Sequence, residues 1–183
     1  FLFSLFLIIL ILIPILLSDF ISWKGQFSTT ILLNSVLLGL GVGFAEELIF
    51  RAWLLEEIKI GYGLKIAMFS QALVFSLAHP LSNFYFWNIL GLRLGLFLLG
   101  ILLSLIRLRG KGSLWNCIGV HGGLVGIWFF INNGLIEFAD NTPSFLAGTF
   151  SQNIPNPIGS LSSILILIIL CIFYLKKSKN IIF

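Results

Sequence analysis

The sequence predicts an all-α membrane protein, a polytopic bundle of about six transmembrane helices. Hydrophobic residues make up 58% of the 183 residues and charged residues only 10%, and the mean hydropathy is +1.09. About a quarter of the residues of a soluble domain are charged. With so few charges a soluble fold could not cover its surface for water, whereas a lipid bilayer favours an apolar surface.

Six apolar segments, separated by charges or turn residues, are the expected helices. They are residues 1–17, 30–55, 64–79, 86–106, 114–131 and 160–175. Since a helix needs about 20 apolar residues to span a bilayer, we expect residues 1–183 to form a single transmembrane domain. The first segment resembles the apolar part of a signal peptide, but it lacks a basic flank and a cleavage site, so we interpret it as a span. Residues 132–158, rich in Asn, Pro and Ser, are expected to form one long surface loop.

The basic residues of the connections predict the orientation of the chain. Eight of them follow the second, fourth and sixth segments, which six spans would place on one side: Lys59, Lys65, Arg107, Arg109, Lys111, Lys176, Lys177 and Lys179. The other side has only Lys24, together with Asp19, Glu137 and Asp140. Because cytoplasmic loops are enriched in Lys and Arg, we expect a cytoplasmic C-terminus. The basic residues are scattered and do not form the clustered face that a nucleic acid requires.

Two glutamates and two arginines remain inside apolar segments, where a charged residue at the helix centre costs about 2.5–3.5 kcal/mol on insertion. Glu46, Glu47 and Arg51 belong to the second segment and Arg93 to the fourth. Glu47 and Arg51 are four residues apart, so they share a helix face and can form an ion pair. Such a pair can serve helix packing alone. Glu46 lies ~100° around the helix from Glu47 and is free to face another group.

Both histidines of the chain, His79 and His121, also lie in apolar segments. Counted from the basic ends of the helices, Glu46 and His121 lie roughly 12–15 Å deep and His79 roughly 20 Å deep, at ~1.5 Å per residue. Glycines before the glutamates and around His121 let helices approach closely or leave room for a water-filled cavity. We therefore expect Glu46, Glu47, Arg51, His79 and His121 to line one cavity that opens toward the cytoplasmic side.

A carboxylate with two imidazoles is suited to general-base or metal-assisted hydrolysis by water. The sequence has no H-E-x-x-H motif of zinc peptidases and no G-x-S-x-G motif of serine hydrolases. A zinc site formed by Glu46, His79 and His121 is geometrically feasible, but no local motif supports it. Water activated by a glutamate is the simplest remaining chemistry, and it needs no cofactor. Cys117 and Cys171 lack metal-binding spacing and are expected to be buried thiols.

Three short motifs resemble those of a known family of membrane peptidases. Glu46-Glu47-Leu-Ile-Phe-Arg51 is similar to E-E-x-x-x-R, Phe75-Ser-Leu-Ala-His79 to F-x-x-x-H, and His121 to the start of H-x-x-x-N/D. These are signatures of the type II CAAX-processing endoprotease and bacteriocin-processing family (CPBP), and they occur in the family's order. The family-like core covers about residues 30–133.

The resemblance implies an intramembrane glutamic peptidase that cleaves a hydrophobic or membrane-anchored peptide or protein without a metal. It implies that Glu46 is the general base and that Glu47 and Arg51 pair and orient the site. It further implies that His79 and His121 position the water and stabilise the oxyanion. Membrane lipid and the peptide are the expected partners. Frequent Phe, Ile and Asn indicate an AT-rich genome, and a compact chain indicates a bacterium. We therefore expect a bacterial plasma membrane and no prenylated substrate.

One residue departs from the family pattern, because Val125 stands where the third motif has Asn or Asp. The resemblance assigns that amide to the oxyanion, and loss of one such donor lowers the rate by about 10²–10³-fold. Asn116 or Asn132 could replace it, or the chain is a slow or non-catalytic member. A membrane scaffold or immunity-type protein that keeps the polar cluster for helix packing is therefore the alternative function. A small transporter is a third, which the absence of an internal repeat disfavours.

Overall fold

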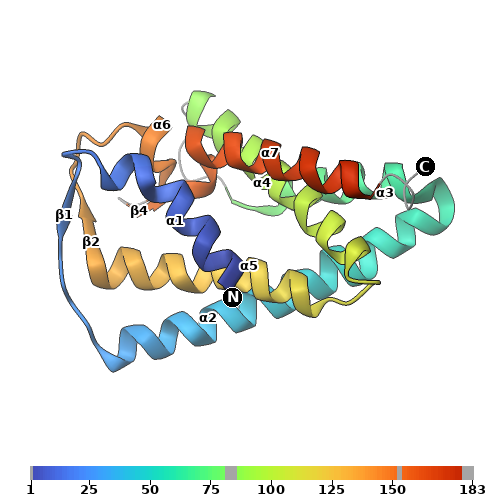
Figure 1. Ribbon diagram of the computed structural model, residues 1–183, viewed down its shortest axis with the longest axis horizontal. Coiled ribbons are helices and arrows are strands. Elements are labelled where there is room, and N and C mark those ends of the chain that lie inside the picture. The colour runs from blue at the N-terminus through green and yellow to red at the C-terminus, as the bar shows by residue number, and fades with distance from the viewer. Residues whose placement is uncertain (1, 81–85, 152–153, 179–183) are drawn as a thin grey trace.

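Long helices make up the molecule, as the sequence predicts (Figure 1). The computed structural model describes residues 2–80, 86–151 and 154–178. The long helices are α1 (Leu2–Leu16), α2 (Thr29–Glu47), α3 (Leu55–Ala78), α4 (Phe86–Arg109), α5 (Trp115–Phe130) and α7 (Leu161–Lys177). Each of the six apolar segments contains one of these helices or most of it, so the all-α class is confirmed.

The second helical segment continues further than expected. A π-helical stretch (Leu48–Leu54) joins α2 to α3 without a break, and the helical path is interrupted at Gly63 rather than near residue 55. Gly63 has φ 79° and ψ 166°, a conformation that a residue with a side chain rarely adopts. The charged residues after Leu55 do not end the helix, because Glu and Lys are good helix formers and the glycine supplies the turn.

Residues 132–158 form several short elements rather than the single loop expected. A second π-helical stretch (Ile131–Leu135) leads into β2 (Ile136–Phe138), which pairs antiparallel with β1 (Ile21–Trp23). The remaining elements are α6 (Ser144–Ala147), β3 (Thr149–Ser151), β4 (Ile154–Asn156) and a 3₁₀ turn (Pro157–Gly159), with β3 antiparallel to β4. These pairings give the backbone polar groups of the connection partners within the protein.

The outer surface of the helices suits lipid. Among the described residues, three helical stretches are long and apolar enough to cross a membrane, namely Thr29–Ala78, Asn88–Arg109 and Trp115–Leu135. Large apolar side chains face outward along α2, α3 and α7, for example Leu37, Phe69 and Ile169. Water disfavours such a surface and a bilayer favours it. The number of six spans stays a prediction.

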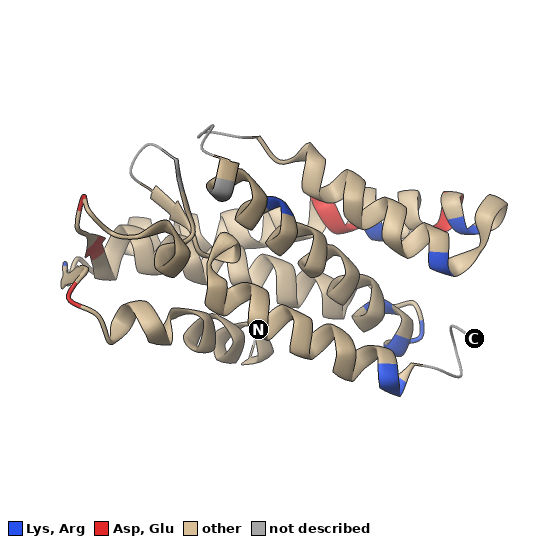
Figure 2. Cartoon of the chain, turned by 90° about the horizontal axis from the view of Figure 1, so that it is seen from above, with Lys and Arg blue, Asp and Glu red and all other residues tan. Residues whose placement is uncertain are grey.

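The charges of the connections separate into two ends of the molecule. In Figure 2 the Lys and Arg positions gather toward one end and acidic positions occupy the other, with a mixed group between them. Two contacts join the basic connections: Arg107 Nη2 lies 3.1 Å from Glu56 Oε1, and Arg109 Nη1 donates to the Lys177 oxygen at 2.8 Å. We call the end that contains Arg107, Arg109 and Lys177 the basic end, and the end formed by β1 and β2 the acidic end. Which end faces the cytoplasm stays a prediction.

Helices α2 and α5 pack closely through their glycines. They run side by side in Figure 1. A Cβ atom added to Gly43 would lie 2.8 Å from the Gly122 Cα atom, and one added to Gly39 would lie 2.5 Å from the Gly122 oxygen. Gly41 has open space around it instead. Of the two roles that the sequence allows for these glycines, close helix approach is the one that Gly39 and Gly43 serve.

Candidate active site

The two adjacent glutamates end α2 and face different surroundings. Glu47 is fully buried, and its Oε1 atom lies 2.9 Å from Arg51 Nη1 and 2.8 Å from His121 Nδ1. The ion pair expected from the four-residue spacing is therefore present. Arg51 sits in the π-helical stretch, also fully buried, and its Cζ atom lies 4.2 Å from the centre of the Phe75 ring. This ring face gives the guanidinium a cation–π contact in addition to the carboxylate.

His79 owes its position to the proline that follows it. The residue before a proline disfavours the helical conformation, and His79 has φ −76° and ψ 132° directly after the last residue of α3. Its Nδ1 atom lies 2.8 Å from the Phe75 oxygen. Pro80 therefore ends α3 and turns the imidazole back along the last turn of its own helix.

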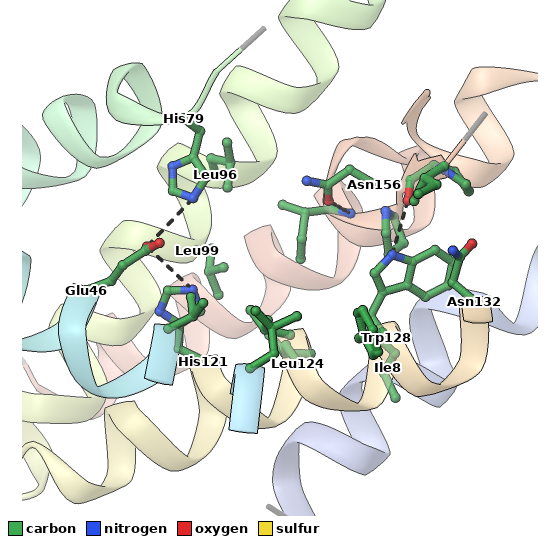
Figure 3. A pocket seen from close by; sticks show the side chains of 18 of the residues that line it. Ile8, Glu46, His79, Leu96, Leu99, His121, Leu124, Trp128, Asn132 and Asn156 are labelled. Atoms are coloured by element: carbon green, nitrogen blue, oxygen red, sulfur yellow. Dashed lines mark hydrogen bonds and ion pairs between the residues drawn. The ribbon is translucent and has the colours of Figure 1, made fainter. Parts of the chain in front are cut away.

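Glu46 lies between the two imidazoles (Figure 3). Its Oε2 atom is 3.7 Å from His79 Nε2 and 3.8 Å from His121 Nε2. Both distances exceed a direct hydrogen bond, and this Oε2 atom is buried without a hydrogen-bond partner among the described residues. Polar atoms at such a separation are typically bridged by a water molecule. The structure thus brings a carboxylate and two imidazoles, from three helices, around a space suited to one small ligand.

The hydrogen-bond partners fix which ring nitrogen of each histidine carries the proton. The Phe75 oxygen and the Glu47 carboxylate can only accept, so each Nδ1 atom donates. A neutral imidazole then has an unprotonated Nε2 atom, which is an acceptor. Both Nε2 atoms therefore present lone pairs to the space beside Glu46. A water molecule there could donate to two of these three acceptors.

An apolar cavity of about 460 Å³ begins at this group. Glu46, His79 and His121 line one end of it, whereas Glu47 and Arg51 lie behind the wall. Its other described lining residues are apolar, apart from three amides: Ile8, Leu38, Val42, Leu96, Leu99, Leu124, Val125, Trp128, Phe129, Asn132, Asn133, Ile154, Pro155, Asn156, Pro157 and Ile158. Figure 3 shows Asn132 and Asn156 at the end away from Glu46.

The direction of the cavity corrects one expectation from the sequence. We expected it to open toward the basic end, but its far wall is formed by residues 132–133 and 154–158, beyond the C-terminal end of α5. Packed side chains lie on the basic side of the polar group, including Phe75 and Leu103, each 0% exposed. Gln71 bridges α3 and α4 there, donating to the Gly100 oxygen at 3.1 Å and to Ser104 Oγ at 2.7 Å.

The structure shows where the two amides that could replace the family's Asn or Asp lie relative to the site. Val125 lines the cavity one turn after His121, so the position faces the site as the family pattern requires. Asn116 lines a separate cavity with Arg109, near the basic end. Asn132 lines the main cavity, but it follows His121 by eleven residues, which is roughly 16 Å along a helix. Neither amide lies where the missing one would be.

Two site residues have no role in the sequence interpretation. In the sequence Phe75 is only the first residue of the F-x-x-x-H motif. In the structure its ring packs against Arg51 and, at centroid distances of 4.7 and 5.6 Å, against His79 and His121. Arg93 was noted as an ionisable residue in an apolar segment, and it binds the backbone of α3 at His79. Only the helix packing shows which groups these two side chains meet. Among the described residues no group of three or more His, Cys, Asp or Glu side chains has the geometry to hold a metal ion.

A bundle of apolar helices that encloses a carboxylate and two imidazoles beside a cavity defines an integral membrane protein with an intramembrane site. The family model of the type II CAAX prenyl endopeptidases, Rce1-like, matches residues 28–127, more than half of the chain. The chain belongs to this family, which is one of CAAX-type intramembrane proteases. No curated protein and no solved structure matches the chain. The match contains Glu46, Glu47, Arg51, His79 and His121.

Proposed function

We propose that the chain is an intramembrane endopeptidase in which Glu46 activates a water molecule to hydrolyse a peptide bond. The observation that supports it most is the buried Glu46 Oε2 atom, which has no hydrogen-bond partner in the described part of the chain and faces the Nε2 atoms of His79 and His121. A buried acceptor without a partner costs about 1–3 kcal/mol. A bound water molecule would remove this cost and would be the nucleophile.

The reaction balances with these groups. The Glu46 carboxylate takes a proton from the water as its oxygen attacks the carbonyl carbon of the substrate. The carbonyl oxygen becomes the oxyanion of a tetrahedral intermediate. When the C–N bond breaks, the proton passes from Glu46 to the leaving nitrogen, which releases an amine and a carboxylic acid. The acid then loses its remaining proton to the amine or to water. General-base catalysis of this kind contributes about 10²–10⁴-fold.

The pair of Glu47 and Arg51 supports the histidine rather than the substrate. An Nε2 atom that is an acceptor can position the water, but it must first take up a proton from solvent before it can donate to an oxyanion. The Glu47 carboxylate, 2.8 Å from His121 Nδ1, would stabilise the imidazolium that results. Arg51 offsets the charge of Glu47. His121 is therefore the better proposed donor to the oxyanion, and His79 the better proposed partner of the water.

The cavity walls indicate the chemistry of the substrate. Apolar side chains from α1, α2, α4 and α5 line it, and its volume of about 460 Å³ lies in the range of ligand sites. None of the described lining side chains is a lysine or an arginine, so nothing there would neutralise a negatively charged segment of a substrate, and Glu46 is the one carboxylate among them. We propose a hydrophobic, uncharged stretch of a membrane peptide or membrane-anchored protein as the substrate.

Zinc held by Glu46, His79 and His121 is the alternative mechanism. Histidines that bind metals usually donate their other ring N–H to a carboxylate or a backbone carbonyl, and both histidines do so here. The side chains would have to move to coordinate an ion, because they lack that geometry in the structure. When bound, zinc would polarise the attacking water. The metal-free route is the one we propose.

The test compares wild-type protein with Glu46→Gln in lipid nanodiscs, using a library of hydrophobic peptides and one prenylated peptide as probes. We expect cleavage of apolar peptides by wild type only, with equal thermal unfolding midpoints, no stoichiometric zinc and no inhibition by 1,10-phenanthroline. One zinc per chain would favour the metal mechanism. No cleavage of any probe or of co-purified membrane peptides would favour the non-catalytic scaffold, which the valine at position 125 in the cavity wall also supports.

A further inference from the structure

Arg93 places a guanidinium in the apolar helix α4, where a charged side chain is costly. Its Nη1 atom donates to two carbonyl oxygens at the end of α3, that of Ser76 and, at 2.9 Å, that of His79. Ser76 Oγ donates in return to the Arg93 oxygen at 2.8 Å. The Arg93 side chain therefore binds the backbone at the C-terminal end of α3, at the residue that carries the imidazole, His79.

Pro80 explains why this end of the helix needs a donor. In an α-helix the Ser76 oxygen would accept from the N–H group of residue 80, and a proline has no N–H group. In a membrane a backbone group without a partner costs several kcal/mol, and groups freed by a proline must be satisfied by neighbouring helices. The guanidinium of Arg93 supplies the missing donor and also donates to the His79 oxygen.

We propose that Arg93 is the positioning residue of His79. The imidazole is attached at two points, through its Nδ1 atom to the Phe75 oxygen at 2.8 Å and through its backbone to Arg93. Only with both attachments does its Nε2 atom stay 3.7 Å from Glu46 Oε2. Arg93 itself does not line the cavity among the described residues. The consequence for turnover rests on the catalytic role proposed for His79, whereas the positioning does not.

Gln71 provides a matched control for a purely structural link. It also joins α3 to α4 by buried hydrogen bonds, to the Gly100 oxygen and to Ser104 Oγ. It lies eight residues before His79, roughly two turns away. If Arg93 only holds the two helices together, Arg93→Met and Gln71→Leu should have similar effects on the site. If Arg93 positions His79, only Arg93→Met should change the site.

The test observes the imidazoles directly, because the chain has only two histidines. Full-length protein with ¹⁵N-labelled imidazoles is placed in lipid nanodiscs, and His79→Ala assigns the two sets of nitrogen signals. We expect Arg93→Met to shift the His79 signals from one tautomer to a mixture while those of His121 stay in place. Arg93→Lys, which keeps a donor, should retain most of the wild-type tautomer. Gln71→Leu should leave both histidines unchanged.

A second arm measures kcat and KM with a peptide that the wild type cleaves. Arg93→Met should lower kcat between about tenfold and a hundredfold with little change in KM, as expected for a misplaced catalytic group, and it should add nothing in a His79→Ala background. Unchanged His79 signals in Arg93→Met would overturn the proposal, as would equal changes in Gln71→Leu. If Arg93→Met does not fold, wild-type His79 signals in Arg93→Leu, which also has no donor, would overturn it as well. If no peptide is cleaved, the proposed function fails and the imidazole signals still decide the positioning.

Discussion

Glu46 and Glu47 are neighbours in the sequence with different surroundings. The Glu47 side chain is 0% exposed and meets both Arg51 and His121, whereas that of Glu46 is 28% exposed and faces the cavity. A rotation of ~100° per residue accounts for the difference. Two identical carboxyl groups are thereby suited to two tasks, one to hold the site together and one to act on water.

The buried pair should matter for stability. Arg51→Ala leaves the Glu47 carboxylate buried without its cation, so we expect the free energy of unfolding to fall by about 3–5 kcal/mol. Lys59→Ala is the matched control, because the Lys59–Glu56 pair is 3.0 Å long but exposed and should contribute about 0–1 kcal/mol. Thermal and denaturant unfolding in detergent measure both. Equal losses in the two variants would show that Arg51 is solvated.

The valine at the third motif should limit the rate. Val125→Asn places an amide one helical turn after His121, where the family has one, and we expect kcat to rise by about tenfold to a hundredfold. Val125→Leu, which adds no donor, should give no such rise. Turnover of a peptide that the wild type cleaves is the measurement. A lower rate with Asn would mean that the amide is left unsatisfied in the apolar wall, which costs about 1–3 kcal/mol.

At the scale of elements, the contact between α2 and α5 holds Glu47 against His121. Gly43 precedes Glu47 by one turn and would bring a Cβ atom to 2.8 Å from Gly122, next to His121. Gly43→Ala should therefore separate the helices and lower the free energy of unfolding by about 1–3 kcal/mol, as overpacking does. Gly41→Ala meets open space and should be neutral or stabilising by up to about 1 kcal/mol.

Two measurements check this prediction. Unfolding midpoints in detergent should order the proteins as Gly41→Ala at or above wild type, and Gly43→Ala below it. The turnover of Gly43→Ala should fall as well, because His121 moves away from Glu47. If both alanine variants behave alike, the close approach of α2 and α5 does not hold the site.

The sequence predicts the helices well and their details less well. Hydrophobic runs locate the long helices, and the four-residue spacing of Glu47 and Arg51 predicts their ion pair. The π-helical stretch that contains Arg51 could not be predicted, because a change from i→i+4 to i→i+5 hydrogen bonds leaves no compositional mark. The break at Gly63 lies in the connection expected between residues 55 and 64. The helical continuation of the residues before it was not expected, because their charges are interpreted as the end of the helix.

The convergence of Glu46, His79 and His121 follows from their depth in the bundle, which residue counts give directly. The partners of Arg93 and Phe75 depend on how the helices face one another, and residue counts do not give that. Whether a cavity lies above or below a polar group depends on side-chain volumes from several helices at once. For this reason the sequence did not predict that the cavity extends away from the basic end, or that Glu47 and Arg51 lie behind its wall.

At the scale of the whole molecule, the cavity occupies the half away from the basic end. If that end is cytoplasmic, as the excess of Lys and Arg predicts, the substrate reaches the site from the outer side. Ile154 lines the cavity and is 49% exposed, so Ile154→Cys should react with a membrane-impermeant thiol reagent on intact cells. Lys111→Cys at the basic end should react only after the membrane is permeabilised.

The native cysteines provide the control for this labelling. Cys117 and Cys171 are both buried, so the wild type should stay unlabelled in both conditions. Labelling of Lys111→Cys but not of Ile154→Cys on intact cells would reverse the orientation. The cavity would then face the cytoplasm, and the substrate would reach it from that side.

The pairing of Glu47 with Arg51 inside one helix also bears on how the protein is made. His121, the other partner of Glu47, follows it by 74 residues, so α2 enters the membrane well before α5 has been synthesised. Arg51 is only four residues away, and it compensates the carboxylate as soon as the first turns close. If the counter-ion were on a later helix, the Glu47 carboxylate would stay unpaired in lipid until that helix was synthesised. The nascent helix therefore enters the bilayer with the Glu47 carboxylate already paired, and His121 later binds a carboxylate that is held in place.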